Sequence, residues 1–327
     1  MDLYRKKEYL VNEPSEIKEK LNEYGVAIIE NVLNKEEILR MNTGMFDYLE
    51  HITKNFEIPI TRDNEESWRE YSKLYPKHNM LLQQWQVGHA QFIWDIRQNE
   101  KICDIFAKIW EVNKEDLICS FDGASFHFPH EITKRGWFKN EWFHTDQKFA
   151  NNDFDCIQSW ITGYDVNKGD ASLSFLEKSH LFRDQFNERF MMKDHKDFKK
   201  NWFKLSSEQV EFFVNKGCER RCVTCKEGSI VLWDSRLMHC GKEPLKEREN
   251  KKFRNVVYVC MKPRNLCSNA NLRKRIKAFE ELRMTTHYPE CPRLFPKYPR
   301  TYGGPLPNVV EINPPKLNKL GKKLVGY

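Results

Sequence analysis

The sequence lacks several features that would assign it to a particular class of protein. No apolar stretch approaches the ~18 residues that a transmembrane helix needs, and the N-terminal segment MDLYRKKEYLVNEPSEI lacks the apolar core of a secretion signal. The chain has no internal repeat and no low-complexity run. We therefore expect a soluble cytoplasmic protein without a membrane span, whose 10 cysteines are reduced thiols rather than a disulfide framework.

A second CxxC motif, which a zinc ribbon would require, is also lacking. Cys218, Cys222 and Cys225 in GCERRCVTCKEG could offer three thiolates to zinc, but the same segment is typical of a strand that leads into a turn. Buried thiols are therefore the favoured interpretation. The net charge of +7 is spread along the chain with acidic residues between the basic ones, so it gives little support for a nucleic-acid partner.

Helical patterns dominate the N-terminal part of the chain, residues 1–116. The segment SEIKEKLNEY begins at the candidate N-cap Ser15 and ends before Gly25, and a second amphipathic segment begins at the capping residue Asn34. A strand, GVAIIENVL, is predicted between them, and NEKICDIFAKIWE predicts a further helix. Residues 55–98 show no clear pattern.

The pattern changes in residues 117–263 to short β-branched and aromatic segments separated by turn residues, which indicates an all-β core. A charged, helix-like segment, residues 181–215, interrupts that core as an insertion. Residues 264–327 contain a basic helix, a proline-rich stretch expected to lie on the domain as an extended arm, and a final segment expected to be a loosely held tail. We expect residues 1–327 to form a single α+β domain.

Two His-x-Asp pairs are candidates for an iron site, His144 with Asp146 in EWFHTDQ and His195 with Asp197 in KDHKDFKK. With 10 histidines and 16 aspartates in 327 residues, about 0.5 such pairs are expected by chance, so the spacing alone decides nothing. In a strand, residues i and i+2 point the same way, and the aromatic flank of the first pair favours a strand. Lysines surround the second pair, which we interpret as a solvated surface.

An iron site of this kind takes two imidazoles and one carboxylate on one face of an octahedron. His239, which follows an apolar strand in GSIVLWDSRLMHCG, is the best candidate for the third ligand. A carboxylate cosubstrate needs a buried cation, and the planar fork of arginine binds it through two hydrogen bonds. Arg254 begins the next strand, RNVVYVCM, and is favoured over Arg248, which lies in the charged turn KEREN.

His144, Asp146, His239 and Arg254 occur in the order and setting that this chemistry requires. With these residues, the chain resembles the phytanoyl-CoA dioxygenase-like branch of the iron(II)/2-oxoglutarate oxygenases. WFHTDQ resembles the iron-binding strand of that family, CIQSWITGYDVNKGDASLSFLEKSH the following strand and turn, and GSIVLWDSRLMH the distal histidine segment. RNVVYVCM resembles its arginine strand, and EYGVAIIENVLNKEEI its N-terminal helix and strand. The resemblance covers residues 15–263. It departs from the family at EKSH, where Pro-Gly-Ser-His is usual, and in the long charged insertion.

The resemblance implies a double-stranded β-helix, a jelly-roll, cupin-like barrel with flanking N-terminal helices. It implies iron(II) bound by His144, Asp146 and His239, O2, and 2-oxoglutarate held by Arg254. The implied reaction is hydroxylation, or demethylation through hydroxylation, of an unidentified organic substrate, with 2-oxoglutarate converted to succinate and carbon dioxide. Related halogenases carry a small residue at the position of Asp146, so the carboxylate favours hydroxylation.

Three more residues are expected to line the cosubstrate or substrate pocket, although barrel packing explains them equally well: Gln158, Trp160 and Ser235. His127 is expected to be a structural histidine. Two other functions stay open, a β-helix that serves as a binding module without catalysis, and a zinc- and nucleic-acid-binding protein that uses the cysteine cluster and the basic tail. The substrate, a small molecule or a modified macromolecule, and the oligomeric state are left open.

Overall fold

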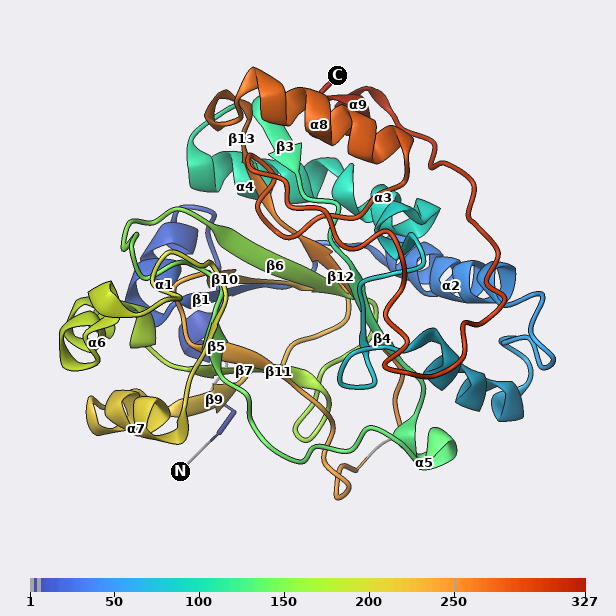
Figure 1. Cartoon of the computed structure of the whole chain (residues 1–327), viewed down its shortest axis with the longest axis horizontal. Helices are drawn as coiled ribbons and strands as arrows, with labels where there is room; N and C mark the ends of the chain where they lie inside the picture. Colours follow the sequence, from blue (N-terminus) through green and yellow to red (C-terminus); the bar gives the residue numbers. More distant parts are fainter. Residues whose placement is uncertain (1–2, 5–6, 250) are drawn as a thin grey trace.

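Strands rich in β-branched and aromatic residues form antiparallel sheets in the computed structural model (Figure 1). The structure describes residues 3–4, 7–249 and 251–327, so part of the segment inspected for a secretion signal lies outside it. The larger sheet has the order β1 (Val26–Ile29), β10 (Ile230–Asp234), β6 (Ile157–Thr162), β12 (Arg254–Val259), β4 (Ala124–His127), β2 (Leu81–Leu82). The smaller sheet has the order β8 (Phe203–Lys204), β5 (His144–Thr145), β11 (His239–Lys242), β7 (Ser172–Leu176), β9 (Arg220–Cys222). A separate pair consists of β3 (Leu117–Cys119) and β13 (Met261–Pro263).

Successive strands from β4 to β12 alternate between the two larger sheets, apart from the run β7 to β9, which stays in one sheet. Strands β4, β6, β10 and β12 belong to the larger sheet, whereas β5, β7, β9 and β11 belong to the smaller one. The two sheets lie one above the other in Figure 1. Residues from neighbouring strands along the chain therefore meet across the interior from opposite sheets.

Helices cover the larger sheet. On the N-terminal side these are α1 (Glu16–Tyr24), α2 (Lys35–Ile52), α3 (Gln91–Arg97) and α4 (Glu100–Trp110). The predicted stop at Gly25 is confirmed, with φ of 82° at the C-cap, and Asn34 forms a capping box with Glu37. Ser15 occupies the N-cap position of α1 but forms no capping hydrogen bond through its side chain.

The stretch of residues 55–98 has no simple pattern because it is built largely of short and tight elements. A 3-10 helix (Glu65–Leu74) and a one-turn 3-10 helix (Val87–His89) flank β2, and α3 follows them. Their apolar side chains pack with α2 and the larger sheet into one continuous core. Leu49 is fully buried in that core, so its replacement by alanine would cost about 2–5 kcal/mol of stability.

The charged insertion forms α6 (Arg183–Arg189), a 3-10 turn (Met192–Asp194), β8 and α7 (Ser207–Asn215). It extends the smaller sheet, because β8 pairs with β5 so that Lys204 lies opposite His144. The aromatic residues of α6 and α7 pack together beneath that sheet, with the Phe186 and Phe213 rings stacked at 5.1 Å. The insertion is therefore structurally tied to the strand that carries the first His-x-Asp pair.

The C-terminal part begins with α8 (Asn269–Glu280), and the proline-rich arm that follows crosses the molecule as the red-orange trace in Figure 1. Buried Lys262 forms ion pairs of 2.7 Å with both Asp155 and Glu290, and so fastens the arm to the core. The prediction of a loosely held tail is wrong. The last residues form α9 (Lys319–Val325), whose Leu324 is fully buried, because its apolar side chains complete the layer over β3.

The structure bears on two further predictions. The mixture of helices with antiparallel sheets is confirmed, and most of the strands lie between residues 117 and 263. No helix in the described parts of the chain is both long and apolar enough to span a membrane.

Candidate metal centre

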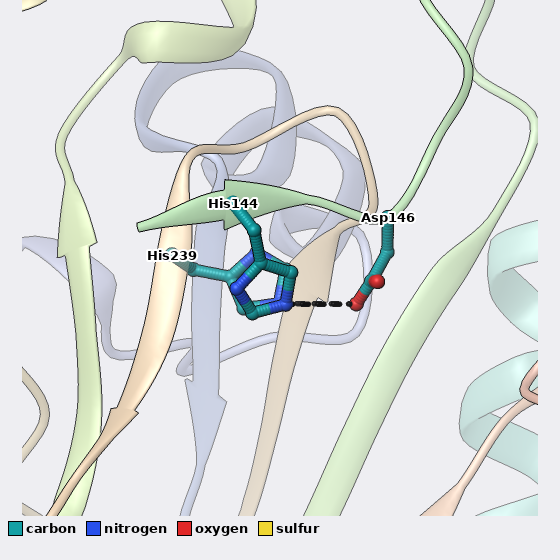
Figure 2. Close-up of side chains that lie close together, drawn as sticks. All are labelled: His144, Asp146 and His239. Carbon is teal, nitrogen blue, oxygen red and sulfur yellow. Dashed lines mark ion pairs between the residues drawn. The ribbon is translucent and has the colours of Figure 1, made fainter. Parts of the chain in front are cut away.

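Strand pairing brings the two histidines of the candidate centre together. His239, the first residue of β11, lies directly opposite His144, the first residue of β5. Asp146 follows β5, and its backbone N–H donates a hydrogen bond of 3.1 Å to the carbonyl of Ser235, which lies in the turn before β11. The three side chains converge at one point, as Figure 2 shows.

The distances suit a small metal ion. Nε2 of His144 and Nε2 of His239 lie 3.5 and 3.3 Å from Oδ2 of Asp146. Adjacent ligands of an octahedral first-row ion are about 3 Å apart, because each bond is about 2.1 Å long. Among the described residues this is the only group of three His, Cys, Asp or Glu side chains whose ligand atoms all lie within 4.8 Å of one another. Two imidazoles and a carboxylate on one side of the ion fit iron(II).

Burial and mutual attraction set the ionisation of the ligands. Burial lowers the pKa of the His144 imidazole, although Asp146 acts in the opposite direction. Burial also opposes ionisation of Asp146, but attraction to His144 and His287 outweighs it and holds the pKa of that carboxyl well below its usual value. A metal needs a neutral imidazole and an anionic carboxylate, so both groups favour their ligand forms near neutral pH.

Backbone carbonyls orient the imidazoles. Nδ1 of His239 lies 2.9 Å from the carbonyl oxygen of Leu237, and Nδ1 of His144 lies 3.4 Å from that of Trp142. A carbonyl can only accept, so these contacts favour the tautomer with a proton on Nδ1 and leave Nε2 free for a metal. The indole of Trp142 also stacks flat on the His144 ring at 4.8 Å, which restricts its rotation.

Two side chains hold Asp146 from outside the ligand set. Nε2 of Gln158, on β6, donates a hydrogen bond of 3.0 Å to Oδ2 of Asp146. The hydroxyl of Tyr288, in the C-terminal arm, donates one of 3.0 Å to the Asp146 carbonyl. Gln158 was expected in the pocket, and it also hydrogen-bonds to the carboxylate of Asp146. Tyr288 was not predicted, because 142 residues separate it from its partner.

A buried arginine, also missed from the sequence, fastens the strand between the ligands. Arg183, at the start of α6, is 1% exposed and donates to the Thr145 hydroxyl at 2.9 Å. It also donates to the carbonyls of Gln147 and Lys148 at 3.0 and 2.8 Å. Burial lowers the pKa of this guanidinium to about 9. In the sequence, Arg183 is one arginine at the edge of a charged insertion. An arginine in that position is equally typical of a solvent-exposed helix, so its burial could not be predicted.

The metal centre opens into a cavity of about 710 Å³. Gln158, Trp160 and Arg254 line it, as expected, together with Tyr258 and the three candidate ligands. The guanidinium of Arg254 donates to the Ser125 hydroxyl and the Ala171 carbonyl, both at 2.8 Å, and hydrogen-bonds to Tyr258. None of these partners is an anion, so this buried cation has no carboxylate bound to it among the residues that the structure describes.

The rival arginine is already neutralised. Arg248 donates to both carboxylate oxygens of Glu131 at 2.8 Å and lies 3.3 Å from Asp170. It does not line the cavity. His127 lies opposite Arg254 in the neighbouring strand, where it is buried with its Nδ1 at 3.1 Å from the Phe128 carbonyl, also outside the cavity.

The structure places Ser235 outside the cavity lining, contrary to expectation. Its carbonyl accepts hydrogen bonds from the Asp146 backbone and, at 3.0 Å, from the Thr145 hydroxyl, so it shapes the ligand loop through its main chain. A side-chain pattern could not reveal this, because any residue offers the same carbonyl.

The other candidate sites are not assembled. His195 is exposed in a turn, where its Nδ1 accepts the backbone N–H of Asp197 at 3.1 Å, and Asp197 pairs with Lys200. The three clustered cysteines are all buried. They do not form a metal-binding group among the described residues.

Most of the chain is similar to known proteins. The family model described as phytanoyl-CoA dioxygenase (PhyH) matches residues 21–244. The Ava biosynthesis cluster protein O of Aspergillus versicolor is 25% identical over 270 residues, which cover 81% of this chain and 83% of that protein.

Solved structures resemble the chain in fold. A protein of Salmonella typhimurium LT2 superimposes with a TM-score of 0.60 at 15% identity, over 98% of this chain and 86% of that one. The hypothetical protein JW0805 of Escherichia coli gives 0.58 at 15% identity, over 96% and 82%. At such low identity the likeness is one of fold alone.

Proposed function

The chain belongs to the phytanoyl-CoA dioxygenase family, and from this membership we propose that it is an iron(II)/2-oxoglutarate-dependent hydroxylase of an organic small molecule. Membership supports an oxygenase, and it confirms the prediction of iron(II) and 2-oxoglutarate as cofactors at the level of the family. The hydroxylation outcome and the roles of individual residues belong to the proposal. The observation that carries it is the convergence of His144, Asp146 and His239 on a cavity that also exposes Arg254.

We propose that the two larger sheets form a double-stranded β-helix. The alternation of strands between the sheets from β4 to β12 supports this assignment, since such a barrel winds its chain between two facing sheets. In this assignment residues 1–327 act as one oxygenase domain, with the N-terminal helices and the C-terminal arm covering the barrel.

In the proposed site, His144, Asp146 and His239 hold iron(II), and their placement on one face leaves the cavity side open to ligands. Arg254 binds the distal carboxylate of 2-oxoglutarate, because it is a buried cation without an anionic partner among the described residues. Trp160 packs beneath it, with the guanidinium 5.7 Å from the ring centroid. Arg248 is excluded from this role by its ion pairs with Glu131 and Asp170.

When bound, iron and 2-oxoglutarate supply the oxidation, in which O2 is consumed and 2-oxoglutarate becomes succinate and carbon dioxide. The protein holds the reactants in place and excludes water. Gln158 fixes the orientation of the Asp146 carboxylate, and the backbone carbonyls behind the two imidazoles fix theirs. The walls of Trp142 and Trp233 shield the reacting end of the cavity.

The carboxylate ligand favours hydroxylation over halogenation. Asp146 occupies the third protein ligand position, which a halide would otherwise need. Demethylation remains a variant of the same chemistry, since hydroxylation of a methyl group attached to nitrogen or oxygen gives an unstable product. The substrate, therefore, and not the metal site, decides between these two outcomes.

The proposal is tested by the binding of 2-oxoglutarate to the protein under anaerobic conditions with iron(II), followed in air by the formation of succinate. We expect the wild type to bind 2-oxoglutarate in an iron-dependent manner and to produce succinate slowly even without substrate. His144→Ala should lose iron binding, whereas Arg254→Ala should keep iron and lose most of its affinity for 2-oxoglutarate.

The matched control for Arg254→Ala is Arg248→Ala, and the matched control for His144→Ala is His195→Ala. A wild type that binds iron but no 2-oxoglutarate would refute the proposed function. Loss of 2-oxoglutarate binding in Arg248→Ala, with Arg254→Ala unaffected and both variants folded, would reassign the cosubstrate site.

A further inference from the structure

The cavity in front of the metal centre contains more cations than acids. Arg254 and three further cationic side chains line it, whereas its acids are Asp122 and Asp146. In the proposed site the charges of iron(II), Asp146, Arg254 and the 2-oxoglutarate dianion cancel. The remaining cations face the space left for substrate: Lys77, Lys274 and Arg293.

Asp122 offsets only part of this charge even when it is ionised, because its single carboxylate faces three cations. It is the one remaining acid of the lining, and burial raises the pKa of its carboxyl despite attraction to His287. Its Oδ1 also accepts the backbone N–H of Gly123 at 2.7 Å, so it is engaged by its own loop. The substrate space therefore keeps an excess of positive charge when iron and cosubstrate are present.

Lys77 lies in a tight loop before β2, where its backbone N–H and carbonyl both pair with Leu81 at 2.9 and 2.8 Å. Burial lowers the pKa of its ammonium group, and repulsion from Arg300 adds to this, whereas Asp146 raises it. The Lys77 side chain is exposed, and it lines the same cavity as Asp146. Across residues 3–4, 7–249 and 251–327, no carboxylate pairs with this lysine.

Two buried lysines of this protein have partners within it. Lys262 has two carboxylates at 2.7 Å, and buried Lys242 lies over the Phe138 ring with its ammonium 3.8 Å from Cys222 Sγ. Lys77 differs from these two, because it is exposed and lines the cavity without a carboxylate partner among the described residues. Its ammonium group is therefore available to an anion that enters the cavity from solution.

Lys274 and Arg293 approach the same space from elements distant in sequence. Lys274 comes from α8 and Arg293 from the proline-rich arm, and both side chains are exposed to solvent. Aromatic side chains form much of the remaining wall, including Trp142, Trp233 and the 53% exposed Trp202, whose ring lies 6.0 Å from that of His144. The cavity lining thus combines aromatic side chains with three cations in addition to Arg254.

We infer that the substrate is an organic anion with an apolar or aromatic body, and that its carboxylate or phosphate group binds Lys77, with Lys274 and Arg293 adding to the attraction. The inference rests on the proposed function, because it assigns Arg254 to the cosubstrate. Anchoring an anionic group at Lys77 would leave the apolar body of the substrate facing the iron along the tryptophan wall.

The test uses the full chain loaded with iron(II) and saturating 2-oxoglutarate under anaerobic conditions. Calorimetric titrations with phenylacetate, phenyl phosphate and the neutral phenylacetamide compare anions with a neutral analogue. We expect at least one anion to bind tenfold or more tightly than the amide, and the preference to weaken as salt is added. The stronger of the two anions distinguishes a carboxylate substrate from a phosphate.

Lys77→Met should reduce the preference for the anion to less than threefold, and Lys77→Arg should retain it. The matched control is Lys297→Met, which removes an exposed cation of the arm outside the cavity lining. If Lys77→Met does not fold, the double variant Lys274→Met/Arg293→Met replaces it, with an expected loss of at least threefold in the preference.

Equal binding of anion and amide by the loaded wild type, or failure of all three compounds to bind, would overturn the inference. A preference that survives in folded Lys77→Met would overturn the role of this lysine. Failure of the proposed function is recognised separately, because the wild type would then not bind 2-oxoglutarate in the loading step.

Discussion

The two His-x-Asp segments of this chain differ in what surrounds them. His144 and Asp146 lie in and beside a strand of an antiparallel sheet, where the ladder places His239 directly opposite. His195 and Asp197 lie in an exposed turn, and the histidine bonds to the backbone of its own partner. The same His-x-Asp spacing thus gives two converging side chains in the first segment, whereas in the second segment it gives a turn in which the histidine hydrogen-bonds to the backbone of the aspartate.

The difference shows that a ligand pair depends on the elements that hold it. The first pair is supported by β11, by Gln158 of β6, by Arg183 of α6 and by Tyr288 of the arm. Within the described part of the chain, the side chains of the second pair bond to near neighbours in sequence, and the His195 ring lies 5.4 Å from the Phe203 ring. Substitutions in the first pair and its supports should therefore have effects that matched substitutions in the second pair lack.

The largest effect is expected from Asp146→Asn. This change keeps the shape of the side chain and removes the charge that iron(II) needs, so affinity for iron should fall by more than the about 10–100-fold typical of losing an outer contact. A calorimetric titration with iron(II) measures this affinity. Asp197→Asn is the matched control and should bind iron as the wild type does. Unchanged iron affinity in Asp146→Asn would contradict the assignment of the first pair.

A smaller but substantial loss of stability is expected from Arg183→Met. The change removes the buried guanidinium that donates to the Thr145 hydroxyl and to the carbonyls of Gln147 and Lys148, which should cost about 2–3 kcal/mol. Urea unfolding measures the free energy. Lys200→Met, which removes the exposed partner of Asp197, should change stability by less than about 0.5 kcal/mol. Equal effects of the two variants would show that Arg183 does not brace the ligand strand.

A smaller effect, a loss of iron affinity with little loss of stability, is expected from Gln158→Leu. The leucine fills a similar volume but cannot donate to Oδ2 of Asp146, so iron affinity should fall about tenfold while stability changes little. Comparing iron affinity with urea unfolding separates the two effects. If stability falls and iron affinity does not, Gln158 is a packing residue rather than a positioning one.

The smallest effect is expected from the double variant His195→Ala/Asp197→Asn. Its side chains contact neither the cavity nor the metal centre, so iron binding and 2-oxoglutarate binding should stay within twofold of the wild type. Calorimetry under the same conditions measures both. A loss of iron binding here would mean that the two segments are linked through β8 more closely than their contacts indicate.

Local patterns were enough to predict some parts of the fold and of the candidate site. Gly25 and Asn34 bound their helices where capping chemistry places them, and the aromatic strand around His144 could be identified from its neighbours. The two sheets could be anticipated only through the family resemblance, because the pairing of β11 with β5 joins residues 95 positions apart.

The parts that escaped prediction depend on contacts between distant segments. Tyr288 reaches Asp146 from a proline-rich stretch that carries no periodic pattern, and Lys77 lies in a region of short, tight turns. Ser235 acts through a backbone carbonyl, which no side-chain motif reveals. The tail was misjudged because α9 packs against β3 and α8, and the first of these lies far earlier in the chain.

The contact between Tyr288 and Asp146 has a practical consequence for engineering. The arm that carries Tyr288 also supplies Arg293 and Phe295 to the cavity wall, so in the proposed site one segment both shapes the pocket and supports an iron ligand. Under this proposal, substrate selectivity and metal affinity are not independent design variables. A library that randomises the arm to accept new substrates should hold Tyr288 and its anchor Glu290 constant, or many of its members would be discarded for losing iron rather than for rejecting substrate.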